Sequence, residues 1–551
     1  MTRLPYPDAV ASGTGRAAAR LTDWFSARRR LWVWAGPIGV TLLAAVLRLV
    51  NLGSPRELVF DETYYVKDAY TLLNLGYESQ WPEGADALFN AGTVDIFTSG
   101  AAYIAHPPLG KWIIALGLQA FGADDPVGWR ISTAIVGVLA VALLCAVAFA
   151  LFKSSALATL AGGLLAIDGL AIVMSRTALL DNSLMLFTLL GFGAVLLDRQ
   201  QSATRLARWI AARTDAARST DWGPTLWWRP WLVTAGLMFG LASAVKWSGI
   251  YFLAVFAVYT LVVDALARRR AGIAFWASST MVRQAPASFL LTVPVAALAY
   301  VATWTGWFAT TGGYYRDWAS QNETVSWLPQ ALQSFWHYQV SIYSTNLAQD
   351  TPHAYEANPL GWLLLLRPTA FYYRGSAAGE NGCDHDTCAE FVTSIANPIL
   401  WWLGVAAIVY LVYRQIRWPD WRVGLPLTGV AAGYLPWLLY TERTVFQFYT
   451  IVFLPYLILA LVYVVGLVLG RLAVAAGPAP ADAPAPAPAD APAPAPRLTA
   501  AADARHTQAV VAVTVALGLV VATSVFFLSA WEGIQVSGVY QQLHYWLPGW
   551  R

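Results

Sequence analysis

Charged residues are scarce in this sequence. Only 12% of its 551 residues are Asp, Glu, Lys or Arg, and 57% are hydrophobic, whereas about a quarter of the residues of a soluble globular protein carry charge. This composition excludes a soluble globular domain. The hydrophobic residues gather in runs of about 20, the length that an α-helix needs to cross roughly 30 Å of hydrocarbon. We therefore predict an all-α polytopic membrane protein.

Cysteine is also rare, with three residues in the whole chain. Cys145 lies inside a hydrophobic run, whereas Cys383 and Cys388 bracket the polar sequence CDHDTC. If this loop faces an oxidising exterior, a local disulfide is favoured over a metal site. The Asp-His-Asp between the cysteines offers metal ligands, but one short loop does not complete a coordination shell.

No cleavable signal peptide is visible at the N-terminus. Residues 1–30 are polar and rich in arginine, and they lead straight into a full-length hydrophobic run, which is typical of a retained anchor with a cytoplasmic tail. Near the other end, residues 475–496 alternate Pro and Ala. Such a tract is extended and cannot build a core, so we interpret residues 471–507 as a cytoplasmic linker.

Eleven hydrophobic runs are predicted to span the membrane. They lie at residues 31–50, 128–152, 157–175, 178–197, 231–246, 248–264, 286–308, 397–413, 423–440, 448–469 and 508–529. One further stretch, residues 107–122, is ambiguous because its apolar part has only about a dozen residues and would reach about 20 Å as a helix.

The positions of the arginines indicate whether residues 107–122 cross the membrane. Arginine-rich loops occur at residues 199–218, 268–283 and 414–422, and short cytoplasmic loops carry the excess of Lys and Arg. All three loops lie on the side of the N-terminus only if residues 107–122 do not cross. We therefore predict that residues 107–122 form an interfacial or re-entrant helix.

The resulting layout has a transmembrane domain at residues 31–470 and a last helix with an external tail at 508–551. Two large external loops are predicted, at residues 51–127 and 309–396. The chain is expected in the plasma membrane with its N-terminus in the cytoplasm, and nothing in its charge pattern indicates a nucleic-acid partner.

Charged and polar side chains of both signs fall at the external face in this layout. A charge at the bilayer centre costs roughly 2.5–3.5 kcal/mol on insertion scales, so helix ends are favourable places for them. The group comprises Asp61, Glu62, His106, Lys111, Arg130, Arg176, Asp181, Asn182, Lys246 and Arg443.

This combination suits a lipid-linked phosphate beside a general base. Arginine and lysine stabilise negative charge on a phosphate leaving group, so we predict that the basic members of the group bind the donor phosphate. A carboxylate accepts a proton from an attacking hydroxyl. Each of these residues also has a structural explanation without catalysis. The adjacent acids Asp61 and Glu62 are compatible with a solvated loop, and His106 is compatible with a turn. The arginines are compatible with interface anchors that reach the headgroups. The tryptophans are interpreted as a membrane-interface belt.

Several motifs, in order, resemble those of the protein O-mannosyltransferases of the GT-C glycosyltransferase class. They are RLVNLGSP, VFDETYYVKDAY, AHPPLGKW, GWRIST, SRTALLDNSLMLF, GLASAVKWSGIYF and PWLLYTERTVFQFY. The likeness covers about residues 45–255 and 300–465. The second external loop has under 90 residues, too few for the β-trefoil domain of the family's eukaryotic members, and so resembles the actinobacterial branch.

The resemblance implies a GT-C fold and an inverting transfer of mannose from a polyprenyl-phosphate carrier to Ser or Thr hydroxyls of secreted or membrane proteins, possibly as they emerge from the secretion translocon. Asp61 would be the general base, with Glu62 orienting donor or acceptor. Arg130 falls where the family has an arginine needed for activity. No cofactor or metal is predicted, although GT-C enzymes differ in their use of divalent metals.

Four further residues, His106, Arg176, Asp181 and Lys246, match motif positions of the family. Two other functions remain as alternatives. One is a GT-C enzyme that moves another lipid-linked sugar onto a glycan or lipid. The other is a secondary transporter, which would place polar groups at the midplane on broken helices of repeated halves, and neither feature is evident in the sequence.

Overall fold

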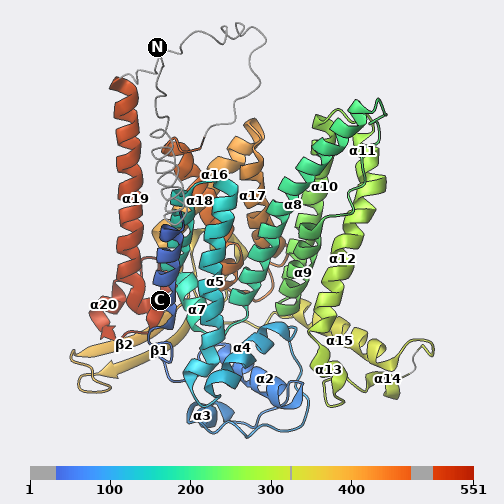
Figure 1. Cartoon of the computed structure of the whole chain (residues 1–551). Helices are drawn as coiled ribbons and strands as arrows, with labels where there is room; N and C mark the ends of the chain where they lie inside the picture. The colour runs from blue at the N-terminus through green and yellow to red at the C-terminus, as the bar shows by residue number, and fades with distance from the viewer. Residues whose placement is uncertain (1–32, 323–324, 473–499) are drawn as a thin grey trace, which may run out of the picture.

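The computed structural model describes residues 33–322, 325–472 and 500–551. The predicted cytoplasmic tail, residues 1–30, and most of the predicted linker lie outside the described residues. Within the described chain, long helices run side by side from one end of the molecule to the other (Figure 1). The predicted helical, multi-span architecture is confirmed at this level.

Six helices of the described chain are long and apolar enough to cross a membrane. They are α5 (Pro126–Phe152), α8 (Asp181–Asp215), α10 (Gly249–Arg270), the continuous stretch Trp276–Ala302 that ends in α12 (Ala285–Ala302), α16 (Pro398–Arg417), and Ala504–Glu532 within α19 (Ala500–Glu532). Start signals are clear in α5, where Pro126 occupies the first turn and the Asp125 side chain accepts a hydrogen bond from the Val127 amide.

A seventh candidate span is a bent pair of helices. The run predicted as one helix at residues 157–175 forms α6 (Ser155–Ile167) and α7 (Gly169–Arg176), bent by 60°. Asp168 stands at the break and accepts a hydrogen bond from the Ala171 amide, which caps the start of α7. Its other oxygen accepts from the Asn397 amide. A buried carboxylate that caps one helix and binds another segment therefore fixes the bend.

The other predicted spans are shorter helices. They are Val33–Leu49, α9 (Pro230–Val245), α17 (Trp421–Tyr434) and α18 (Leu454–Val468). The ambiguous stretch forms α4 (Leu109–Phe121), which packs against α2 (Glu62–Leu75) and α5. At 1.5 Å per residue, its 13 residues reach about 20 Å, short of a bilayer's hydrocarbon thickness. The count of eleven spans stays a prediction.

The all-α prediction is wrong in one region. A three-stranded antiparallel sheet, in the order β1-β2-β3, consists of β1 (Ala370–Ala377), β2 (Thr387–Thr393) and β3 (Val536–Ser537). The first two strands are short and rich in aromatic and β-branched residues. Gly379 and Gly382 in the intervening turn have φ angles of 82° and 73°, which glycine adopts readily. A search for runs of about 20 hydrophobic residues does not detect strands this short.

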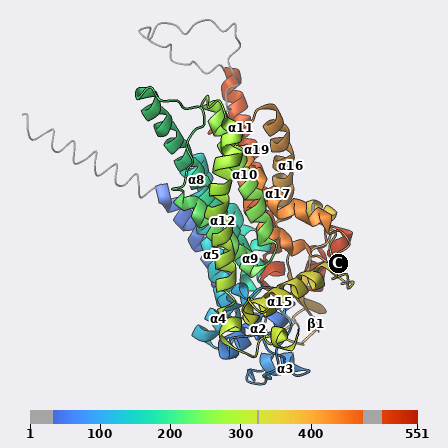
Figure 2. The same ribbon diagram turned by 90° about the vertical axis from the view of Figure 1, so that its right-hand side faces the viewer.

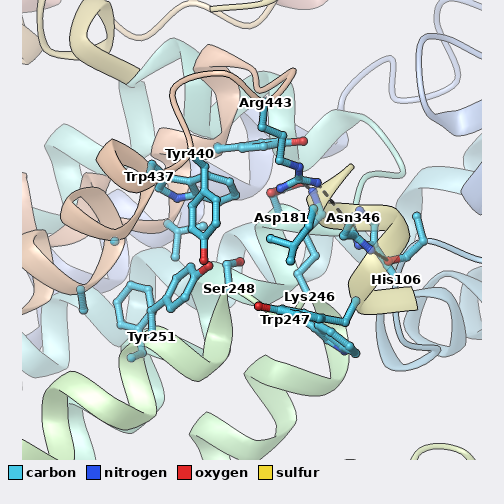
Figure 3. A pocket seen from close by; sticks show the side chains of 18 residues that line it. His106, Asp181, Lys246, Trp247, Ser248, Tyr251, Asn346, Trp437, Tyr440 and Arg443 are labelled. Carbon is cyan, nitrogen blue, oxygen red and sulfur yellow. Dashed lines mark hydrogen bonds and ion pairs between the residues drawn. The ribbon is translucent and has the colours of Figure 1, made fainter. Parts of the chain in front are cut away.

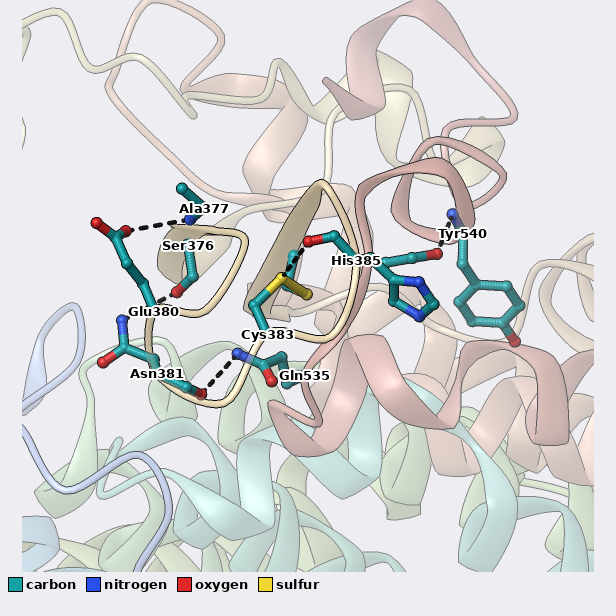
Figure 4. The surroundings of a disulfide bond; sticks show 10 residues. Ser376, Ala377, Glu380, Asn381, Cys383, His385, Gln535 and Tyr540 are labelled. Carbon is teal, nitrogen blue, oxygen red and sulfur yellow. Dashed lines mark hydrogen bonds between the residues drawn. A yellow bond between two sulfur atoms is a disulfide. The ribbon is translucent and has the colours of Figure 1, made fainter.

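The tip of this hairpin is fixed by a disulfide and by the C-terminal segment. Cys383 and Cys388 form a disulfide with a Cα–Cα distance of 5.7 Å. In Figure 4, Gln535 donates a hydrogen bond to the Asn381 carbonyl, at 3.2 Å. The C-terminal residues therefore pack on a hairpin that lies about 150 residues earlier in the sequence.

The two predicted external loops meet at one end of the molecule. Helices α2, α3 (Ala85–Asn90) and α4 of the first loop, and α15 (Gln330–Leu347) and the strands β1 and β2 of the second, lie at the same end in Figure 1. The helix α11 (Trp276–Ser278) marks the other end, as the turned view in Figure 2 also shows.

A buried charge cluster joins α8, α9 and α10. Arg229, just before α9, donates to Asp198 of α8 at 3.1 Å and to Asp264 of α10 at 2.6 Å. All three side chains are almost fully buried. Since removing one partner of a buried ion pair leaves an uncompensated charge, this cluster makes the three helices interdependent.

Arg229→Met is expected to destabilise the protein by about 3–5 kcal/mol, because two carboxylates then remain buried without a cation. Thermal unfolding of the detergent-solubilised protein measures this loss. The triple variant with Asp198→Asn and Asp264→Asn should regain much of the stability, and Arg208→Met, at an exposed position of α8, should unfold like the parent. A parent-like melting temperature for Arg229→Met alone would contradict the cluster's role.

Candidate active site

Asp61 lies at the start of α2, directly after a strained residue. Phe60 has a φ of 49°, which is unfavourable for an aromatic residue. Its ring stacks on Phe371 at 4.8 Å and is enclosed by Phe446 and Phe448 at 5.6 and 5.7 Å. This aromatic packing, to which both external loops and the segment after α17 contribute, holds the turn that presents Asp61.

The Asp61 carboxylate does not cap its own helix within the described chain. The side-chain hydrogen bond that it accepts comes from the Tyr65 hydroxyl and is long, at 3.4 Å. Burial, opposed by the positive charge of Lys246 and reinforced by the negative charge of Asp181, raises the pKa of Asp61 to about 6. The carboxyl group is therefore a stronger base than an exposed aspartate and remains mostly ionised at pH 7.

Glu62 has a different environment from its neighbour. Its side chain is fully buried and receives two hydrogen bonds from Arg130, at 2.8 and 2.7 Å. It also accepts hydrogen bonds from the backbone amides of Val59 and Ala178, at 3.0 and 2.8 Å. Glu62 therefore ties the turn before α2 to α5 and to the segment after α7.

Arg130 is fully engaged in the same cluster. Besides Glu62, its guanidinium donates to three backbone carbonyl groups of the first external loop, those of Leu52, Pro55 and Glu57. Its side chain is 1% exposed. The geometry differs from the predicted contact with the donor phosphate, because each nitrogen already has a protein acceptor. Arg130 instead shapes the loop that leads to Asp61.

Four of the predicted site residues line one cavity near Asp61. The cavity lies between the end of α9, the start of α10, the end of α15 and the segment after α17, as Figure 3 shows. Its acidic, basic and histidine lining residues are His106, Asp181, Lys246 and Arg443. The structure thus gathers residues that lie far apart in the sequence.

The two cations of the cavity are held differently. Lys246 donates to Asp181 at 2.7 Å, and its ammonium lies 4.6 Å from the centre of the Tyr449 ring. Arg443 donates to the Asn346 side chain at 3.0 Å and forms no ion pair among the described residues. Its guanidinium therefore has no carboxylate partner there and can bind an anion.

His106 is a neutral member of the cavity. Burial and the nearby charges of Lys246, Lys111 and Arg443 lower the pKa of His106 well below its usual value. A neutral imidazole gives or accepts a hydrogen bond but supplies no positive charge to a phosphate.

Three other predicted residues have partners outside this cavity in the described part of the chain. Lys111 forms buried ion pairs with Asp68 and Glu78, both at 2.9 Å. Arg176 donates to backbone carbonyls at the end of the helix Val33–Leu49, where a cation satisfies free acceptors. Asn182 donates to the Thr133 carbonyl at 2.9 Å. The structure does not bring these three side chains to the cavity.

Sequence reasoning missed the aromatic walls of the cavity. The lining includes Trp247, Tyr251, Tyr343, Trp437, Tyr440 and Tyr449. The composition predicts an interface belt for the tryptophans, but Trp247 directly follows Lys246, and Trp437 lies six residues before Arg443. This adjacency to charged motif residues was the available signal.

The described residues contain no cluster of three or more His, Cys, Asp and Glu side chains arranged to hold a metal ion. Metal dependence is not tested by this observation, and the expectation of none stays a prediction.

Comparisons with known proteins agree with these features. A family model described as dolichyl-phosphate-mannose-protein mannosyltransferase matches residues 38–214, and one described as the C-terminal four TMM region of protein-O-mannosyltransferase matches residues 331–550. The chain's fold is similar to that of a solved structure of the S. cerevisiae protein O-mannosyltransferase Pmt1-Pmt2 complex bound to the sugar donor. That match has a TM-score of 0.64 and 13% sequence identity, and covers 94% of this chain and 93% of the other.

Curated relatives extend along nearly the whole chain. A polyprenol-phosphate-mannose–protein mannosyltransferase of Mycobacterium tuberculosis is 32% identical over 537 residues, which cover 95% of this chain and 92% of the relative. One of Mycolicibacterium smegmatis is 31% identical over 530 residues, covering 94% and 93%. One of Corynebacterium glutamicum is 29% identical over 446 residues, covering 78% and 82%. The chain therefore belongs to the protein O-mannosyltransferase family.

Proposed function

We propose that this protein transfers mannose from a polyprenyl-phosphate-mannose donor to Ser or Thr hydroxyls of proteins at the external face of the membrane, with Asp61 as the general base. Membership of the family makes the chain a mannosyltransferase of protein O-mannosylation and removes the transporter alternative. The catalytic assignment rests on the Asp61 carboxylate, which makes no capping hydrogen bond to α2 and lies beside a cavity lined by two cations.

The reaction follows from this arrangement. An acceptor hydroxyl attacks the anomeric carbon of mannose while Asp61 takes the hydroxyl proton. The new carbon–oxygen bond forms as the bond from the anomeric carbon to the phosphate oxygen breaks, which inverts the anomeric centre. The polyprenyl phosphate leaves with the bonding electrons. The raised pKa of Asp61 brings the base closer to the operating pH.

Lys246 and Arg443 are the residues that we assign to the leaving phosphate. Both line the cavity, and positive charge in a site shielded from water stabilises the developing negative charge. Lys246 also draws Asp181 into the site and favours the ionised form of Asp61. Glu62 and Arg130 act through the loop geometry, as positioning residues.

The membrane placement is part of the same proposal. Eleven spans, including the short helices, would put both external loops and the cavity outside and the arginine-rich loops in the cytoplasm. A polyprenyl chain would then lie in the outer leaflet with its phosphate at the level of Lys246 and Arg443.

Asp61→Asn is expected to lower the transfer rate by about 10²–10⁴-fold, because the amide cannot accept the proton. The assay supplies polyprenyl-phosphate-mannose and a Ser/Thr peptide to the purified enzyme and measures mannosyl-peptide. Asp124→Asn, at an exposed carboxylate, is the control. Transfer by Asp61→Asn at the parent rate would refute the assignment of Asp61 as the base. If the parent enzyme used another lipid-linked sugar in preference to polyprenyl-phosphate-mannose, mannose would not be the transferred sugar.

The pH dependence should carry the signature of Asp61. Below about pH 6 the carboxylate is protonated, so kcat/KM should fall about tenfold per pH unit, and it should level off above pH 7. Lys246→Met removes the charge that lowers this pKa and should move the limb to higher pH, whereas Asp181→Asn should move it to lower pH. Limbs that stay in place in both variants would contradict the electrostatic arrangement.

Arg443→Ala and Arg130→Ala should fail in different ways. Loss of a charged hydrogen bond to phosphate is expected to raise the KM for the donor about tenfold in Arg443→Ala, with a melting temperature near that of the parent. Arg130→Ala leaves Glu62 buried without its cation and should lower the melting temperature strongly. A donor KM unchanged in Arg443→Ala would exclude the phosphate role.

A further inference from the structure

A second cavity lies at the opposite end of α10 from the candidate active site. It is enclosed by α8, α10 and α17 and has a volume of about 670 Å³, within the range of small-molecule pockets. Tyr251 of α10 lines the first cavity and Arg268 the second. The first cavity reaches Phe252 of α10 and the second begins at Tyr259, seven residues or about 10 Å further along the helix, and the two linings share no residue.

The charge of the second cavity is positive and unbalanced. Four arginines and two aspartates line it: Asp198, Arg199, Arg229, Asp264, Arg268 and Arg270. Both aspartates pair with Arg229. The other three arginines form no side-chain ion pair with the described residues, so the cavity presents cations that a bound anion would neutralise.

The positions of these arginines favour a bound anion. Arg199 lies over the Trp421 ring at 4.6 Å, and Tyr259 and Arg270 of α10, which also line the cavity, act on it electrostatically. Asp420, which is outside the cavity lining and also acts on Arg199, is bound to Arg422 at 2.9 Å. Two neighbouring guanidinium groups without a carboxylate repel each other unless an anion lies between them.

Arg268 is a further cation at the wall of the second cavity. The residue is 1% exposed. Its Nη2 atom donates to the Pro224 carbonyl and to the Gln284 side chain, each at 2.9 Å, and its Nη1 atom donates to the Asp264 carbonyl at 3.3 Å. Its Nε atom is buried and has no hydrogen-bond partner among the described residues. Arg268 forms no ion pair among the described residues, so its positive charge adds to the attraction of the cavity for an anion.

The cavity also reaches the apolar outer surface of α10. Val262 and Leu266 line it and remain 50% and 39% exposed, and Val258, one turn earlier, is 62% exposed. A helix face of this kind in a membrane-spanning bundle contacts lipid chains. A molecule with a phosphate and hydrocarbon chains would therefore match both parts of the cavity.

We propose that this cavity binds the phosphate group of an anionic phospholipid, with Arg199 and Arg270 contacting the phosphate and the acyl chains along Val262 and Leu266. Basic pockets between membrane helices bind such headgroups through charge-assisted hydrogen bonds. The site goes beyond the transfer reaction, because it lies apart from Asp61 and the donor cavity.

The test uses the full-length protein purified in detergent and titrated with dioleoyl phosphatidylglycerol, with binding measured by native mass spectrometry. Arg199→Gln combined with Arg270→Gln should weaken binding at least about tenfold. The matched control combines Arg205→Gln with Arg208→Gln, which removes two charges from α8 outside the cavity, and should bind like the parent. Melting temperatures without lipid check that both variants are folded.

Two further probes identify the source of the phosphate. Dioleoyl phosphatidylcholine should bind weakly and equally to all three proteins. Inorganic phosphate that competes with phosphatidylglycerol at similar concentrations would assign the cavity to a free phosphate anion instead of a lipid. Equal binding of phosphatidylglycerol to the parent and to the Arg199/Arg270 variant would overturn the proposal.

Discussion

The buried ion pair between Glu62 and Arg130 is the interaction on which the candidate active site depends. It joins the first external loop to α5 and to the segment that precedes α8, and each oxygen and nitrogen of the pair has a partner. A buried carboxylate that is paired and hydrogen-bonded holds its charge at a tolerable cost. The adjacent Asp61 accepts a long hydrogen bond from the Tyr65 hydroxyl, at 3.4 Å, and forms no ion pair among the described residues. Two adjacent acids therefore have different environments, one held by several partners and one held weakly.

Much of the site followed from the sequence, because charged residues at the ends of hydrophobic runs had to lie near a membrane face. That constraint brought His106, Asp181, Lys246 and Arg443 into one group, and the structure gathers them around one cavity. The same constraint could not separate Arg443 from Arg176. Their roles differ because Arg176 meets backbone carbonyls at a helix end, and the position of those carbonyls depends on how the chain turns.

Features that depend on distant pairing were beyond the sequence. Strand β2 pairs with β3 through Cys388 and Ser537, which are separated by helices α16 to α19. The bend at Asp168 depends likewise on Asn397, a residue of another segment. Local hydrophobicity predicts that a helix exists, but it contains no information about which remote amide a buried carboxylate will bind.

The pairing of β3 with β2 also bears on the order of biosynthesis. Residues 536–537 follow α19 in the chain, and chains fold from the N-terminus during synthesis, so the sheet is completed only after α19 has been made. The hairpin beside Phe60 therefore keeps an open edge on β2 until residues 536–537 have been synthesised. The sheet is consequently completed late, and a nascent chain arrested before α19 would present an unpaired strand edge.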